Sequence, residues 1–101
     1  MQQDIRSLVS QGLYQQNLTQ LIELCDARFD RNPALYGTLH YIFRALAEEY
    51  DDQAIPQERY ELIMHSLERP ILRLLEAEEA PAEDFLDRLC AVLRGFRGVV
   101  G

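Results

Sequence analysis

The chain has 101 residues, a net charge of −7 at neutral pH and a hydrophobic fraction of 48%. This hydrophobic content excludes a disordered chain, and the length suits one domain with a single core. All ten basic residues are arginine, which excludes chemistry that needs a lysine, such as Schiff-base formation. The acidic balance argues against nucleic acid and anionic membrane surfaces as direct partners.

Two further features of the sequence bear on its location. No apolar run approaches the roughly 20 residues that a bilayer span requires, and the first residues lack the pattern of a signal peptide. The two cysteines, Cys25 and Cys90, stand far apart, and each falls within an apolar helical stripe. Both are therefore expected to be free, buried thiols. We expect a cytoplasmic protein without a membrane span.

Apolar residues recur with helical period along the chain, and no segment shows sustained strand alternation. A first helix is expected over about residues 4–16, and a second over about 17–30 with Asn17 as its N-cap. Asn32 and Pro33 form a clear helix start, a capping residue followed by proline at the first helical position. The third expected helix continues from there to about Tyr50.

The fourth expected helix begins at Pro56 and extends to about Ala77. Pro70 falls inside it, where it removes one hydrogen bond and leaves the carbonyl of Ser66 without its helical partner. The apolar residues keep the same helical periodicity before and after Pro70, and this favours one kinked helix. A break into two helices stays open.

The fifth expected helix begins at Pro81 and has a broad apolar side. Asp84 and Arg88 have the favourable spacing for an ion pair within it. Gly95 and Gly98 are expected to end the chain in a short flexible tail. The chain is thus expected to be all-α, a compact bundle of about five helices in a single domain, 1–101. The apolar side of the last helix comprises Phe85, Leu86, Leu89, Cys90, Val92, Leu93 and Phe96.

The sequence contains no recognisable catalytic arrangement. The two histidines are His40 and His65, and no glycine-rich phosphate loop or nucleophile motif is present. Ser66 follows His65, but adjacent helical residues point about 100° apart and do not face each other. We expect neither an enzyme nor a cofactor.

One helix facet could bind a metal ion. Glu61, His65 and Glu68 stand at positions i, i+4 and i+7, and carboxylate and imidazole groups are ligands for zinc or iron. The spacing differs from the Glu-x-x-His pattern of di-iron bundles. We therefore favour an exposed charged flank and assign no metal site.

An acidic cluster stands where a helix disfavours it. Its four acids lie at the C-terminal end of the third helix, where the helix dipole prefers cations. Two tyrosines flank the cluster, and tyrosine is a favoured anchor at interfaces. We expect a docking surface for a basic protein partner here. The surface comprises Glu48, Glu49, Tyr50, Asp51, Asp52 and Tyr60.

The third helix carries a second face of small and apolar residues, opposite its main stripe. Gly37, Tyr41 and Ala45 recur there at spacing four, and Leu62 of the next helix also lies off its own stripe. The chain thus has more apolar surface than the core of a single five-helix bundle would bury. Two-fold dimers are the commonest oligomers, so a homodimer is expected to use these four residues.

The residues together favour a non-enzymatic, small acidic helical protein that acts through protein–protein interaction, as an adaptor, regulator or assembly factor. Two alternatives stay open. One is an acidic inhibitor that mimics nucleic acid towards a nucleic-acid-binding protein, with steep salt dependence. The other is a metal-binding helical bundle, which metal analysis of the purified protein would reveal.

Overall fold

The computed structural model describes residues 3–52 and 54–100. The regular structure of these residues is helical throughout, with five α-helices and one short 3-10 helix. This confirms the all-α bundle of about five helices. In chain order the elements are α1 (Gln3–Gln11), α2 (Gln15–Ala27), η1 (Phe29–Arg31), α3 (Pro33–Asp52), α4 (Gln57–Glu76) and α5 (Ala82–Val100).

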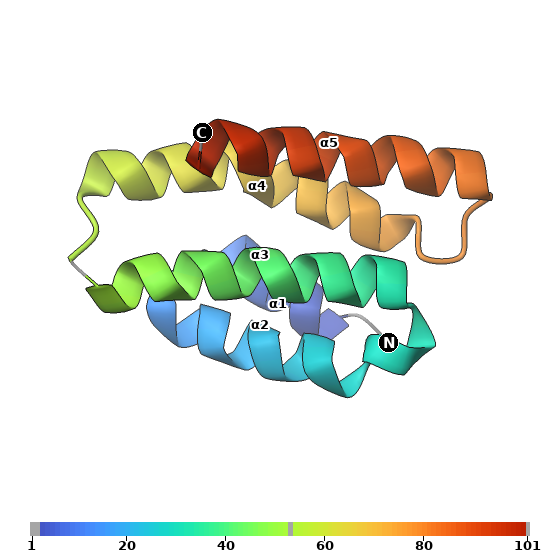
Figure 1. Ribbon diagram of the computed structural model, residues 1–101, viewed down its shortest axis with the longest axis horizontal. Coiled ribbons are helices and arrows are strands. Elements are labelled where there is room, and N and C mark those ends of the chain that lie inside the picture. Colours follow the sequence, from blue (N-terminus) through green and yellow to red (C-terminus); the bar gives the residue numbers. More distant parts are fainter. Residues whose placement is uncertain (1–2, 53, 101) are drawn as a thin grey trace.

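The helices are arranged as two antiparallel hairpins (Figure 1). One hairpin consists of α2 and α3, which are joined through η1, and the other of α4 and α5. The first helix, α1, contacts both α2 and α4, so it packs between the hairpins. Side chains of all three parts therefore share one core, and the Cα radius of gyration is 12.8 Å.

The core is built from aliphatic side chains together with two aromatic ones, Tyr36 and Phe43. Burial of one such side chain stabilises the fold by about 1.5–3 kcal/mol relative to an exposed position. The helical stripes of the sequence supply most of these residues. The fully buried apolar residues of α3 and α4 are Leu35, Tyr36, Leu39, Ile42, Phe43, Leu46, Ile63, Leu67, Ile71, Leu74 and Leu75.

The start of α3 follows its sequence signals. The backbone amide of Leu35 donates a 3.2 Å hydrogen bond to Oδ1 of Asn32, which satisfies one of the free amides of the first turn. Pro33 occupies the first helical position, where its missing N–H costs nothing. The cap predicted at Asn32 is confirmed.

Helix α4 continues through Pro70 from Gln57 to Glu76, so the alternative of two separate helices is wrong. The kink expected at Pro70 stays a prediction. Because Pro70 has no N–H, the carbonyl of Ser66 lacks the usual helical partner. Gly95 of α5 lies directly against this carbonyl, and a Cβ atom at position 95 would overlap with the Ser66 oxygen. The absence of a side chain at Gly95 thus sets the closest approach of α4 and α5.

Several helix boundaries differ from the sequence-based expectation, and the first of them is the end of α1, at Gln11 rather than at about residue 16. Helix α2 begins at Gln15 rather than at Asn17, with Tyr14 at the N-cap position. Asn17 is instead buried, and its amide donates to the carbonyls of Leu8 (3.3 Å) and Gly12 (3.0 Å). The expected C-terminal tail is also wrong, because α5 runs on through both glycines to Val100. Asn17 therefore stabilises the preceding turn through tertiary hydrogen bonds and does not cap α2.

The expectations for Cys90 and Arg88 are wrong as well. Cys25 is buried as expected, but Cys90 is exposed. The part of α5 that packs against the core is narrower than the apolar side of the helix, and Cys90 lies outside that part. Arg88 does not pair with Asp84. Its guanidinium reaches α4, where Nη1 lies 2.8 Å from the carbonyl oxygen of Arg73 and 3.5 Å from a carboxylate oxygen of Glu76. A cation at the C-terminal end of α4 also suits the helix dipole.

Candidate functional site

A pocket of about 370 Å³ lies at the end of the bundle where α3 ends and α4 begins. Three tyrosines form part of its wall: Tyr14 from the turn between α1 and α2, Tyr50 from α3, and Tyr60 from α4. We call this the tyrosine pocket. Its remaining lining residues are Gln15, Ala54, Ile55 and Gln57.

Tyr14 lies in the turn between α1 and α2, and contacts of the two preceding residues fix this turn. Gly12 ends α1 with a φ of 134°, a region that L side chains rarely adopt. The next residue, Leu13, is fixed from two sides: its amide donates to Sδ of Met64 at 3.2 Å, and its carbonyl accepts a 2.6 Å bond from the Tyr50 hydroxyl. Gly12 leaves no room for a Cβ atom, because the Tyr60 hydroxyl occupies that position.

Burial makes two of the tyrosine hydroxyls harder to ionise. It raises the pKa of Tyr50 to about 12, with a smaller contribution from the neighbouring Tyr60. Burial likewise raises the pKa of Tyr60, and the proximity of Tyr14 contributes. Both side chains are uncharged at physiological pH, and the raised pKa values extend the neutral form to higher pH.

The structure divides the acidic cluster into acids of different roles. Glu49 makes a two-pronged ion pair with Arg59, with N–O distances of 2.7 and 2.8 Å. The same guanidinium donates a 2.7 Å bond to the carbonyl of Val99 near the end of α5. Glu49 thus links α3 to α4 and, through Arg59, to α5. It is a structural acid, although the sequence pattern placed it in the docking surface.

The ion pair makes the stability of the fold depend on pH. Arg59 holds the pKa of Glu49 below its ordinary value of 4.5, mainly through their hydrogen bond. Because the folded-state pKa is the lower one, this stabilisation is full above pH 4.5 and is lost as the pH falls through the folded pKa. We expect Glu49→Gln to cost about 1 kcal/mol at neutral pH, since the pair is partly exposed to solvent.

Urea denaturation of the wild-type protein and of the Glu49→Gln variant, at pH 7 and at about pH 3, measures this effect. The difference in unfolding free energy between the wild-type chain and Glu49→Gln should shrink towards zero in acid. An equal difference at both pH values would contradict the role of the ionised carboxylate.

Two other acids of the cluster, Glu48 and Asp51, take part in no ion pair among the described residues. Glu48 and Asp51 are exposed, and Asp51 accepts a hydrogen bond from the amide of Gln15, which lines the tyrosine pocket. With Glu23 of α2 and Arg44 of α3 they border a depression of about 330 Å³ between α2 and α3. The side chain of Asp52 lies outside the described part of the chain. The structure therefore brings Tyr50, Tyr60 and Asp51 to one end of the bundle, together with Tyr14.

The four residues of the expected dimer face lie in different environments. Gly37 faces the ring of Phe29 in η1, which lies 3.0 Å from the position a Cβ atom would take. Tyr41 is 68% exposed, and its ring meets that of Phe96 edge-on at 6.1 Å. Ala45 is half-buried, and Leu62 is 43% exposed on α4.

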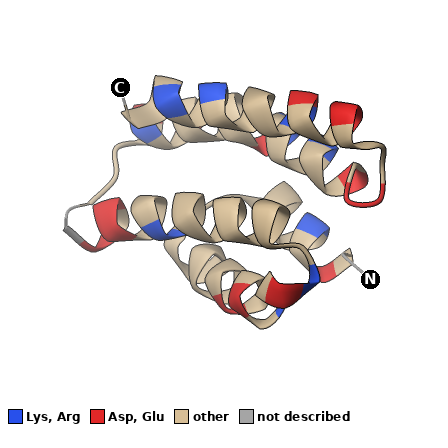
Figure 2. Cartoon of the chain, turned by 45° about the vertical axis from the view of Figure 1, so that its right-hand side comes forward, with Lys and Arg blue, Asp and Glu red and all other residues tan. Residues whose placement is uncertain are grey.

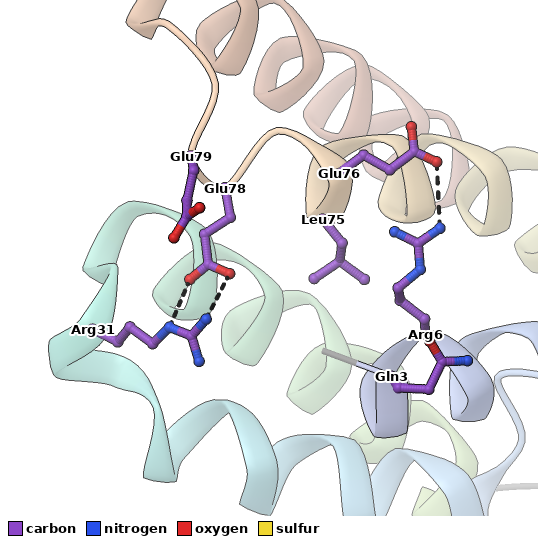
Figure 3. A pocket seen from close by; sticks show the side chains of 7 residues that line it. All are labelled: Gln3, Arg6, Arg31, Leu75, Glu76, Glu78 and Glu79. Carbon is purple, nitrogen blue, oxygen red and sulfur yellow. Dashed lines mark hydrogen bonds and ion pairs between the residues drawn. The ribbon is translucent and has the colours of Figure 1, made fainter. Parts of the chain in front are cut away.

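A pocket of about 560 Å³ lies at the opposite end of the bundle, and Figure 3 shows the side chains that line it. Two ion pairs line it: Arg6 with Glu76 at 3.3 Å, and Arg31 with Glu78 at 3.1 Å. The hydroxyl of Tyr36 also donates to Glu78 at 3.1 Å. Each arginine of the pocket is thus already bound to a carboxylate, and the lining is balanced in charge apart from Glu79. Gln3 and Leu75 complete the lining.

A third pocket, of about 420 Å³, lies between the outer sides of α4 and α5. It includes His65 of the candidate metal facet, together with three arginines and one acid, Asp87. Within the described residues, no group of three or more His, Cys, Asp or Glu side chains is placed so that it could hold a metal ion. Its lining residues are His65, Arg69, Pro70, Arg73, Asp87, Arg88 and Ala91.

Sequence reasoning missed two features of these surfaces. The first is the position of Tyr14. The expected first helix, about residues 4–16, includes Tyr14, whereas α1 ends at Gln11 and Tyr14 lies in the turn that follows. Gly12 is a typical turn signal and could have indicated this. The second missed feature is the pairing of Arg59 with Glu49 of the acidic cluster. A guanidinium one helix away can still reach an acid when the connecting loop is short, as it is between α3 and α4.

The chain is an acidic, all-α protein whose described residues form a bundle of five α-helices, and the tyrosine pocket lies at one end of the bundle. No protein-family model, curated protein or solved structure matches the chain. In the part of the chain that the structure describes, every helix is too short or too polar to cross a membrane.

Proposed function

We propose that the chain is a non-enzymatic interaction module, an adaptor, regulator or assembly factor, which binds a basic segment of a partner protein at the tyrosine pocket. The observation that supports this is the combination of three tyrosine walls with exposed acids on the adjoining end of α3. An arginine or lysine side chain is the occupant that both features favour.

The chemistry of the pocket favours a cation in two ways. A guanidinium or ammonium group is attracted to the faces of neutral tyrosine rings, which contributes about 0.5–2 kcal/mol depending on desolvation. The exposed carboxylates of Glu48 and Asp51 add long-range attraction, which guides a basic segment to this end of the molecule. The overall charge of −7 acts in the same direction.

A test of this proposal has to leave Glu49 in place, because its loss would disturb the link to Arg59 and α5. We therefore reverse the two exposed acids in the double variant Glu48→Arg/Asp51→Arg. Binding is measured by fluorescence anisotropy with a labelled peptide of alternating arginine and serine. We expect affinity to fall about 10-fold or more, and the salt dependence of binding to weaken.

A matched control carries the same change in net charge at the other end of α2. Asp26 and Asp30 are exposed and take part in no ion pair among the described residues. The variant Asp26→Arg/Asp30→Arg should retain most of the peptide affinity. Equal losses in the two double variants would mean that the peptide responds to net charge alone, and the docking surface would be refuted.

The tyrosine walls are tested separately from the acids. Tyr14 is 40% exposed, so Tyr14→Leu keeps an apolar wall and removes the aromatic face without emptying the core. We expect a loss of about 3-fold to 10-fold in affinity for the same peptide, as one cation–π contact would supply. Unchanged affinity would place the peptide outside the pocket.

The proposal also covers the setting in which the protein acts. We place it in the cytoplasm as a homodimer. Its acidic charge supports the further expectation that it makes no direct contact with nucleic acid or anionic membranes. Affinity purification from the native host at low and high salt identifies the partner. A salt-sensitive partner that itself binds nucleic acid would favour the nucleic-acid mimic over an adaptor.

A further inference from the structure

An apolar stripe runs along the outside of α5. Leu86, Leu93 and Val100 stand seven residues apart and are 55%, 46% and 58% exposed. Leu89 and Phe96 fill the intervening three- and four-residue steps, and both are partly buried against the core. This alternation is the pattern of the a and d positions of a coiled coil, which form one seam along a helix. We call these five residues the α5 seam.

The seam gathers much of the exposed apolar surface of the molecule. Its three exposed members and Tyr41 account for four of the seven large hydrophobic side chains that are exposed among the described residues. Tyr41 adjoins the seam, because its ring packs edge-on against Phe96. Scattered surface hydrophobics are ordinary, whereas a continuous line of them marks a contact surface.

Apart from Arg88, which binds α4, the charges of α5 are divided by sign along the helix. Acidic residues occupy the N-terminal half of α5, whereas Arg94 and Arg97 lie in the C-terminal half (Figure 2). None of these side chains takes part in an ion pair within the described residues. Such a helix is complementary to a copy of itself that runs in the opposite direction, and antiparallel helix dipoles add to the attraction. The acids concerned are Glu83, Asp84 and Asp87.

We propose that two copies of the chain associate through the α5 seam, with their α5 helices antiparallel and the two-fold axis near Cys90 and Ala91. In this register Leu89 of one copy packs against Leu93 of the second, and Leu86 packs against Phe96. The apolar residues of the seam are then covered from both sides, and Tyr41 borders the contact.

Each end of the same register brings opposite charges together. Glu83 of one copy faces Arg97 of the second, and two-fold symmetry repeats this pair at the other end. A parallel pairing would instead put the acidic halves side by side. This inference rests on the homodimer of the proposed function and deepens it by naming the face, which differs from the one that the sequence suggested.

The first test compares two identical substitutions at similarly exposed leucines. Sedimentation velocity of the intact chain, from micromolar to millimolar concentration, gives its dimer dissociation constant. Leu93→Arg puts a charge into the middle of the seam and should weaken dimerisation about 10-fold or more. Leu62→Arg, on α4 at 43% exposure, should leave it unchanged. Circular dichroism checks that both variants stay folded.

A charge exchange tests the antiparallel register itself. Glu83→Arg and Arg97→Glu should each weaken the dimer about 3-fold or more, because each creates like charges across the interface. The double variant Glu83→Arg/Arg97→Glu should restore the affinity of the wild-type chain. Losses that add up in the double variant would overturn the antiparallel register.

A short bis-maleimide reagent tests the position of the axis. It should link the two copies through their exposed Cys90 thiols, whereas Cys25 is fully buried and out of reach. Cys90→Ser should give no linked dimer. A dimer that persists in Leu93→Arg would overturn the seam and leave the proposed homodimer standing. A chain that is monomeric at all concentrations would overturn both, while the peptide-binding experiment judges the tyrosine pocket independently.

Discussion

We expect Gly95→Ala to lower the free energy of unfolding by about 1–3 kcal/mol, as overpacking of a close contact does. Alanine is the better helix former, so propensity alone would make this substitution stabilising by about 1 kcal/mol. The added methyl group, however, would overlap with the carbonyl oxygen of Ser66. That oxygen belongs to the backbone of α4 and cannot turn aside as a flexible side chain could. The two helices therefore have to move apart.

Gly98 provides a matched control in the same helix. No atom lies within 4 Å of the position that a Cβ atom would take there. Gly98→Ala should therefore raise the free energy of unfolding, by about 0.5–1 kcal/mol. Urea denaturation followed by circular dichroism measures both variants. If Gly95→Ala proved as stabilising as Gly98→Ala, α5 would not pack against Ser66 as closely as described.

Gly12→Ala is the second substitution for which we expect a large effect, a destabilisation of about 2–4 kcal/mol. Part of this cost is backbone strain, about 1–3 kcal/mol, because Gly12 has a φ of 134°. The remainder arises from the Tyr60 hydroxyl, which occupies the place of the new methyl group. Displacement of Tyr60 would also disturb the tyrosine pocket, so peptide affinity should fall along with stability.

The two causes can be separated with Tyr60→Phe, which removes the hydroxyl and keeps the ring. Gly12→Ala should cost less in the Tyr60→Phe chain than in the wild-type chain, by about 0.5–1 kcal/mol in a double-mutant cycle. The backbone part of the cost should remain. Thermal or urea denaturation of the four chains gives the cycle. Equal costs in both backgrounds would show that Gly12 and Tyr60 do not meet.

The parts of the fold that follow from short-range signals were predictable. Asn32 and Pro33 define the start of α3 through a cap and a fixed φ, and the structure contains that cap. The stripe of α4 keeps its phase on both sides of Pro70, and the helix is continuous. In such segments the local preference and the tertiary packing agree, so the sequence alone is sufficient.

Other parts depend on neighbours that the sequence does not reveal. The apolar side of α5 is wide enough to face two directions, and only the position of α4 decides that Val92 is buried while Leu93 is exposed. Asn17 has the character of a helix cap, yet it is buried and holds the preceding turn. Tyr50 and Tyr60, which flank the acidic cluster in the sequence, both line the tyrosine pocket, whereas nothing in the sequence indicated the pairing of Glu49 with Arg59.

The two-hairpin arrangement also has a consequence for how the chain folds. Each hairpin joins helices that are adjacent in the sequence, and the connections are short. Closing a short loop costs little chain entropy, and folds rich in such local contacts form quickly. The contact of α1 with α4 spans far more of the chain, so its closure carries the larger entropic cost. The order of events that this favours is formation of the two hairpins first, and their docking around α1 afterwards.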